Sequence, residues 1–163
     1  MVQIDNAINN YLAAGRIMLT RPALSHKLFT IRKTKILMKT VINTSNAPAP
    51  IGPYSQAIRA GNFVFVSGQV AINPISGELI LDDIKNETKQ VMDNISAILI
   101  EAGIDFSHVV KTSIFLKDMQ NFARVNEVYG TYFSDNFPAR ETVQVAALPK
   151  NVNVEITVTA FKP

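Results

Sequence analysis

The stretch 82–102 constrains the fold of this chain more than any other segment. Its apolar residues recur three and four positions apart, the spacing that places side chains on one face of an α-helix. These residues are Ile84, Val91, Met92, Ile95, Ile98, Leu99 and Ala102. Asp82 and Asp83 suit a helix N-terminus, and Gly103 suits the C-terminal stop. A helix with a single apolar stripe must bury it against a second layer, so the chain needs a sheet or further helices to cover it.

Segments on both sides of this helix have the character of strands. Runs rich in β-branched and aromatic residues predict strands at 39–44, 55–60, 63–70, 108–116, 139–146 and 152–161. Gly61 and Asn62 suit a two-residue hairpin turn, and 119–133 has the apolar spacing of a second helix. The order β-β-β-α-β-α-β-β predicts an α+β fold, a two-layer sandwich of one sheet and two helices. The second face of the sheet would be bare in a monomer, which favours a closed oligomer.

The charge of the chain is unevenly distributed. Residues 1–37 carry six basic residues and one acidic residue, whereas residues 38–163 carry ten basic and twelve acidic residues, a net charge of −2. We interpret 1–37 as a basic N-terminal extension, disordered or loosely docked, and 38–163 as the one folded domain. The extension is either a mitochondrial targeting segment or an upstream addition to a chain that truly starts at Met38, and the second interpretation is favoured.

Composition excludes several classes of chemistry. The chain has no cysteine and two histidines, which rules out disulfides, thiolate nucleophiles and cysteine-ligated metals and disfavours a histidine metal site. No apolar run approaches the ~20 residues of a membrane span. The domain 38–163 lacks the basic surface expected for nucleic-acid binding. A cysteine-free chain fits a reducing compartment, so we expect a cytoplasmic location, or a mitochondrial one if 1–37 is a transit peptide.

Two charged residues near the C-terminus suggest chemistry. Alternation in the strand 139–146 places Arg140 on one face, and alternation in 152–161 places Glu155 opposite the apolar face. If a hairpin through 148–151 pairs these strands, both side chains come near one surface. The pair alone favours an exposed cross-strand ion pair. The alternative is a pocket in which the arginine grips a carboxylate and the glutamate steers water or a proton.

Three segments resemble one known family. They read NTSNAPAPIGPYSQAIRAGNFVFVSGQVAINPISGEL, VVKTSIFLKDMQNFARVNEVYGTYF and FPARETVQVAALPKNVNVEITVTA, in that order. Together they resemble the Rid family (YjgF/RidA, the reactive-intermediate imine deaminases) from about residue 39 to residue 161. The resemblance implies a chorismate-mutase-like sandwich that forms a homotrimer around a central β-barrel, with three sites in clefts between subunits.

The same resemblance implies an activity. Rid proteins hydrolyse 2-imino acids or their 2-enamine tautomers, such as 2-iminobutanoate and 2-aminoacrylate, to 2-oxo acids and ammonia. The substrates come from pyridoxal-phosphate dehydratases, and the deaminase itself uses no cofactor and no metal. The alternative is a non-catalytic binding or regulatory module, or an RNA-acting protein (ribonuclease or translation inhibitor). The charge of 38–163 makes nucleic acid an unlikely partner of this domain. The resemblance implies a small imino acid as the expected one.

Residue by residue, the resemblance implies two catalytic groups. Arg140 matches the arginine that clamps the substrate carboxylate, and Glu155 matches the glutamate that positions the attacking water. Thr142 occupies a substrate-binding position where many members carry cysteine, so a thiol-dependent mechanism is excluded here.

Four further residues match substrate-binding positions. Tyr54 is the tyrosine of the proline-rich loop over the site. Ser67 and Gly68 match the segment whose backbone contacts the substrate, and Asn126 matches an asparagine near the cleft.

Overall fold

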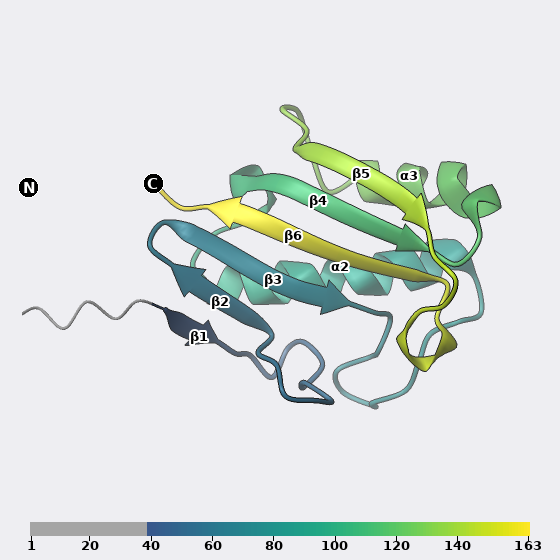
Figure 1. Ribbon diagram of the computed structural model, residues 1–163, viewed down its shortest axis with the longest axis horizontal. Coiled ribbons are helices and arrows are strands. Elements are labelled where there is room, and N and C mark those ends of the chain that lie inside the picture. The colour runs from purple at the N-terminus through teal and green to yellow at the C-terminus, as the bar shows by residue number, and fades with distance from the viewer. Residues whose placement is uncertain (1–38) are drawn as a thin grey trace, which may run out of the picture. The chain divides into compact units, whose positions relative to one another are not determined.

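The computed structural model describes residues 39–163 as a six-stranded sheet with two α-helices on one face (Figure 1). The sheet order is β1-β2-β3-β6-β4-β5. The strands are β1 (Thr40–Ile42), β2 (Ala57–Ala60), β3 (Phe63–Gln69), β4 (Val109–Leu116), β5 (Ala139–Gln144) and β6 (Val154–Phe161). The helices are α2 (Ile84–Glu101) and α3 (Phe122–Gly130), with short 3-10 turns η1 (Phe106–His108), η2 (Met119–Asn121) and η3 (Pro149–Asn151). The predicted element order and the two-layer α+β sandwich are confirmed. The expectations for 1–37 lie outside the described residues.

Helix α2 forms as its apolar spacing predicts. The Asp83 carboxylate accepts a hydrogen bond from the backbone N–H of Lys85 at 2.7 Å, which satisfies one of the free amides of the first turn. At the other end Gly103 takes a φ of +71°, the left-handed conformation that ends many helices. The stripe of α2 packs on the sheet through side chains that are fully buried, including Ile95 and Leu99. Among the described residues, no helix has the length and apolar character needed to cross a membrane.

The second predicted helix is shorter than expected. The prediction covered 119–133, but the α-helix occupies Phe122–Gly130 and follows the 3-10 turn η2, which the Asp118 side chain caps. Beyond it, Phe133 leaves the helix and packs edge-on against Phe106, with ring centroids 5.4 Å apart. Phe133 also packs against Tyr129 of α3, with ring centroids 4.9 Å apart, so the four-residue aromatic spacing continues past the end of the helix.

The pairing of the last two strands differs from the prediction. The expected hairpin between β5 and β6 is wrong, because β4 lies between them, parallel to β5 and antiparallel to β6. Strand β5, with the sequence ARETVQ, is polar and largely exposed, as suits a sheet edge, whereas β4 buries alternate residues on its helix face. The turn after β5 reverses the chain but does not determine which strand it joins.

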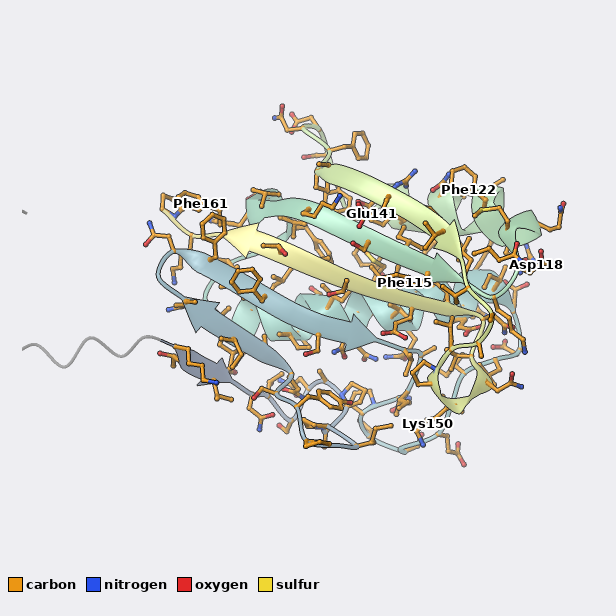
Figure 2. The ribbon with its side chains drawn as sticks, viewed as in Figure 1. Phe115, Asp118, Phe122, Glu141, Lys150 and Phe161 are labelled. Atoms are coloured by element: carbon orange, nitrogen blue, oxygen red, sulfur yellow. The ribbon has the colours of Figure 1, made fainter. Side chains whose placement is uncertain are left out.

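The face of the sheet opposite the helices carries exposed apolar side chains. Phe63 and Phe65 of β3 are 43% and 48% exposed, and Phe161 of β6 stacks edge-on against Phe63 with ring centroids 5.3 Å apart. Figure 2 shows Phe115 and Phe161 on this open face, together with Glu141. The bare face inferred from the sequence is present in the single chain.

Candidate functional site

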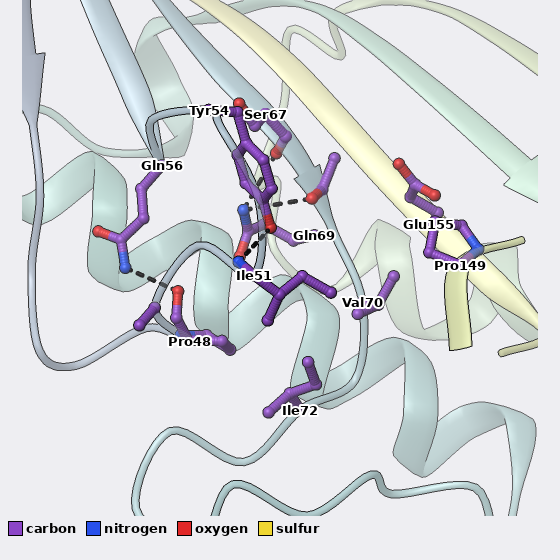
Figure 3. A pocket seen from close by; sticks show the side chains of 12 residues that line it. Pro48, Ile51, Tyr54, Gln56, Ser67, Gln69, Val70, Ile72, Pro149 and Glu155 are labelled. Atoms are coloured by element: carbon purple, nitrogen blue, oxygen red, sulfur yellow. Dashed lines mark hydrogen bonds between the residues drawn. The ribbon is translucent and has the colours of Figure 1, made fainter. Parts of the chain in front are cut away.

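A cavity of about 260 Å³ lies beside the ends of β3 and β6. The polar side chains of Gln56, Ser67, Gln69 and Glu155 line it together with mainly apolar residues (Figure 3), and Gly68 lines the same space. Tyr54 and Ile51, from the proline-rich loop between β1 and β2, line the same space. We call this space the Glu155 cavity. The segments that form it are far apart in the sequence, and the sheet brings them together.

Glu155 is the one carboxylic acid that lines this cavity among the described residues. Burial raises the pKa of its carboxyl group above the ordinary value of 4.5, because the ionised form loses water contacts there. No hydrogen bond or ion pair from residues 39–163 reaches the carboxylate. A half-buried carboxyl group with a raised pKa and a free face towards a cavity is better suited to accepting and returning a proton than an exposed one.

Gly68 makes room for that carboxylate. A Cβ atom at position 68 would overlap Oε1 of Glu155 and lie 2.7 Å from its carboxyl carbon. The β3–β6 register shifts between Val66 and Gln69, so a bulge places the glycine beneath the acid. Glycine is therefore required here by the close approach of a side chain.

The loop that carries Tyr54 is tied down by hydrogen bonds. The Tyr54 hydroxyl accepts a hydrogen bond from the Ile51 N–H at 3.3 Å, and the ring is 47% exposed. The Ser67 hydroxyl donates to the Ser55 carbonyl at 2.7 Å, which anchors the loop to β3. The fold thus brings together four of the seven predicted site residues, namely Tyr54, Ser67, Gly68 and Glu155.

Three buried polar side chains hold the cavity walls and were not singled out from the sequence. Gln56 donates to the carbonyls of Thr44, Ala47 and Pro48, and Asn94 donates to those of Val70 and Ile72. Glu87 accepts hydrogen bonds from the segment just before Glu155. A signal was present for two of them, because Glu87 and Asn94 occupy positions within the apolar stripe of α2.

Arg140 lies on the face of the sheet that the helices cover, against α3. Its Nη1 donates to Oδ1 of Asn126 at 2.7 Å, and its guanidinium lies 5.1 Å from the ring centroid of Tyr129 and 5.8 Å from that of Phe122. Within residues 39–163, no carboxylate forms a salt bridge with Arg140. Stacking and one amide hold the guanidinium while leaving donors free for a planar anion such as a carboxylate. We call the pocket lined by Asn126, Tyr129, Gly130, Phe137 and Arg140 the Arg140 hollow.

Tyr129 and Thr142 complete the surroundings of Arg140. Burial raises the pKa of the Tyr129 hydroxyl, which donates to Oγ1 of Thr112 at 3.2 Å. Thr142 follows Arg140 on the same face of β5, and its Oγ1 is buried without a hydrogen-bond partner in the described part of the chain. Arg140, Asn126 and Thr142 form the second group of predicted residues that the fold brings together.

The two groups do not meet within one chain. Arg140 pairs with Thr112, which is buried beneath the helices, whereas Glu155 pairs with Phe115 on the open face. The expectation that a hairpin places both charges on one surface of a single chain is wrong, because β4 separates the strands and the faces are opposite. Among residues 39–163, no group of three potential metal ligands occurs.

Comparisons with known proteins agree with this fold. Residues 44–162 match the family model described as Endoribonuclease L-PSP. A Mus musculus protein named 2-iminobutanoate/2-iminopropanoate deaminase is 48% identical over 126 residues, which cover 77% of this chain and 93% of that protein. A crystal structure from Thermotoga maritima has 48% identity and a TM-score of 0.76, covering 77% of this chain and 99% of its own. The crystal structure of E. coli TdcF with bound serine has 37% identity and a TM-score of 0.74, covering 76% and 99%.

The family match spans both halves of the candidate site, from the Tyr54 loop to the strand that carries Glu155. Solved structures of Rid and YjgF proteins share the fold at 42–49% identity. The chain therefore belongs to the Rid (YjgF/RidA) family.

Proposed function

We propose that this protein hydrolyses small 2-imino acids and their 2-enamine tautomers, such as 2-iminobutanoate and 2-aminoacrylate, to 2-oxo acids and ammonia. The observation that carries this proposal is the Glu155 carboxyl group. It lies in a mainly apolar cavity above Gly68, its pKa is raised by burial, and no ion pair from the described residues neutralises it. Such a group can take a proton from an attacking water molecule.

The complete site requires two copies of the chain. Arg140 and Glu155 lie on opposite faces of one sheet, so one molecule cannot grip a carboxylate and activate water at the same substrate. We propose that the Arg140 hollow of one copy faces the Glu155 cavity of the next copy in a homotrimer. The exposed apolar face of the sheet supports an assembly, because such a face is normally covered.

The reaction in this site needs positioning more than a strong nucleophile. Arg140 of one copy holds the substrate carboxylate through two N–H donors. A water molecule beside Glu155 of the neighbouring copy attacks the carbon of the protonated imine and gives a proton to the carboxylate, so a C–O bond forms while the C=N bond becomes a single bond to a neutral amine. Glu155 then passes that proton to the amine nitrogen. As the C–N bond breaks and the C=O bond forms, Glu155 accepts the proton of the new hydroxyl group, and ammonia and the 2-oxo acid leave.

Two relatives support a small amino-acid-like substrate. The mouse relative is named for deamination of 2-iminobutanoate and 2-iminopropanoate, and the TdcF structure contains serine, which has the carboxylate and nitrogen of such a substrate. In this chain, the Arg140 guanidinium forms no ion pair with residues 39–163, and it fits that carboxylate.

The activity is tested by generating the imine enzymatically in the assay mixture. A threonine dehydratase converts threonine to the enamine and imine, and semicarbazide traps whatever imine survives. The protein should lower the amount of trapped imine and raise the rate of 2-oxobutanoate and ammonia release. Equal rates with and without the protein would remove the proposal.

The shared site is tested by mixing two inactive variants. Arg140→Ala and Glu155→Gln should each abolish the acceleration, whereas co-expressed chains form some interfaces that pair an intact Arg140 with an intact Glu155. Random association at equal amounts makes about one quarter of the sites complete. Recovery of about a quarter of the wild-type rate supports a site between copies, and no recovery contradicts it.

RNA cleavage is the second candidate, because the matching family model is described as an endoribonuclease. The net charge of −2 on residues 38–163 argues against it, since RNA binding depends on basic side chains that neutralise phosphates. Salt-sensitive binding of single-stranded RNA by a chain that starts at Met38 would favour this candidate over the deaminase.

A further inference from the structure

A buried carboxylate on helix α2 contacts the backbone immediately before Glu155. Glu87 is fully buried, and its Oε1 accepts hydrogen bonds from the backbone N–H of Asn153 at 2.7 Å and of Val154 at 3.3 Å. Its Oε2 accepts from the Asn153 side-chain amide at 2.9 Å. Three donors and the positive N-terminal end of α2 compensate for the loss of water around this carboxylate.

The backbone N–H groups at the start of β6 need hydrogen-bond acceptors from outside the sheet. On one side of β6, the pairing with β3 has its last partners at Gln69 and Ile156, so residues 153 and 154 have no neighbour in β3. On the other side, the Asn153 carbonyl accepts from the Lys117 N–H at 3.0 Å. Glu87 therefore supplies the acceptors that β3 does not provide, and it holds the start of β6 from beneath the sheet.

We propose that Glu87 is a positioning residue for Glu155, and that its hydrogen bonds to Asn153 and Val154 fix the backbone from which the Glu155 carboxylate reaches the space above Gly68. This inference rests on the proposed deaminase function. Glu87 does not line the Glu155 cavity, so it acts on the reaction only through the residues it holds. The Glu155 carboxyl group must lie within a narrow range of positions to direct water at the imine carbon.

A neighbouring residue provides a matched control. Thr88 is also fully buried on α2, but its hydroxyl donates to the Ile84 carbonyl of the same helix at 2.7 Å instead of bonding to the start of β6. Thr88→Val removes one buried hydrogen bond without changing the start of β6. Any general loosening of α2 should therefore appear in both variants.

The decisive variant replaces Glu87 with an apolar residue of similar length. Glu87→Met leaves the amides of Asn153 and Val154 without an acceptor, and we expect kcat to fall about tenfold or more with KM changed by less than about twofold. Glu87→Gln keeps an oxygen for both backbone amides and should restore most of kcat. Thr88→Val should retain kcat even if its melting temperature falls as far as that of Glu87→Met.

A second measurement does not depend on activity. The titration of the Glu155 carboxyl group can be followed by ¹³C NMR in the full chain and assigned by its loss in Glu155→Gln. When the backbone loosens, the carboxyl group should reach water more freely, so its titration should move down towards the ordinary value of 4.5 in Glu87→Met and stay in place in Thr88→Val. Tyr54 is the one other titratable residue that lines the cavity in the described chain, and a carboxyl-selective label keeps the two apart.

The outcomes distinguish the positioning role of Glu87 from the proposed deaminase function. Unchanged kcat and unchanged Glu155 titration in Glu87→Met would overturn the positioning role, and so would an equal loss of kcat in Thr88→Val. If the wild-type protein hydrolyses no imine, the proposed function fails, but the Glu155 titration still tests whether Glu87 holds the carboxyl group in place.

Discussion

Replacing Gly68 by alanine should slow catalysis strongly while leaving the fold intact. The added Cβ would overlap Oε1 of Glu155 and lie 2.7 Å from its carboxyl carbon and 3.1 Å from its Cγ. Carbon atoms pack at about 3.5–4.0 Å, so the carboxyl carbon must move by about 1 Å. A misplacement of that size costs about 100-fold in rate, equivalent to about 2.7 kcal/mol in the activation free energy.

The stability of this variant should hardly change. The overlapping atoms belong to the end of a flexible side chain, and Gly68 is not among the glycines with positive φ. Alanine also restricts the unfolded chain, a gain of about 0.4–1 kcal/mol where the backbone conformation is compatible. We therefore expect the free energy of unfolding to change by less than about 1 kcal/mol in a denaturant titration.

Gly61→Ala is the matched control. Gly61 has a φ of +58° in the β2–β3 turn and nothing within 4 Å of an added Cβ, so alanine should cost about 1–2 kcal/mol of stability and leave kcat unchanged. Steady-state deamination of enzymatically generated 2-iminobutanoate measures kcat in both variants. The reasoning is refuted if Gly68→Ala keeps kcat within about twofold of wild type, or if it lowers kcat equally in a Glu155→Gln background.

Three further predictions concern the remaining site residues. Arg140→Lys should raise KM about tenfold, because an ammonium group cannot replace the two parallel N–H donors of the guanidinium or its stacking on Tyr129. An unchanged KM would contradict the proposal that Arg140 holds the substrate carboxylate. Thr142→Val should raise KM about fivefold if the unpartnered hydroxyl bonds to substrate, with the free energy of unfolding unchanged or increased; steady-state kinetics and denaturant titration measure these two quantities. Glu155→Gln should raise the melting temperature at pH 7, because the raised pKa means that the ionised carboxyl group destabilises the folded state above that pKa. The gain should disappear as the pH falls below 4.5, and a constant gain across this range would disprove the assignment.

Local elements were predictable because their signals lie in neighbouring residues. The spacing of apolar residues predicted α2, and Asp83 and Gly103 marked its ends within two residues. The turn at Gly61 was predictable because few residues other than glycine adopt a positive φ there. The second helix was overestimated because Phe133 keeps the helical spacing to Tyr129 and packs against it, although the α-helix ends at Gly130.

The sequence supplied candidate site residues but not their arrangement. The resemblance to the Rid family supplied the seven site positions, and the fold collects them into two groups. The prediction that Arg140 and Glu155 meet within one chain was wrong, because β4 lies between their strands. A polar strand at the sheet edge and the turn after it do not show which strand is the neighbour. Glu87 was missed because a single acid in an apolar stripe does not show which backbone amides it meets.

The sequence by itself determined where this chain forms helices, strands and turns, and which residues of each strand share a face. Those properties depend on conformational preferences and periodicities that a few adjacent residues carry. Only the tertiary structure decided that β4 separates β5 from β6, that Arg140 and Glu155 point to opposite faces, and that Glu87 holds the start of β6. Strand pairing is set by how all layers of the core pack at once, so the partner of a given strand is a property of the whole fold.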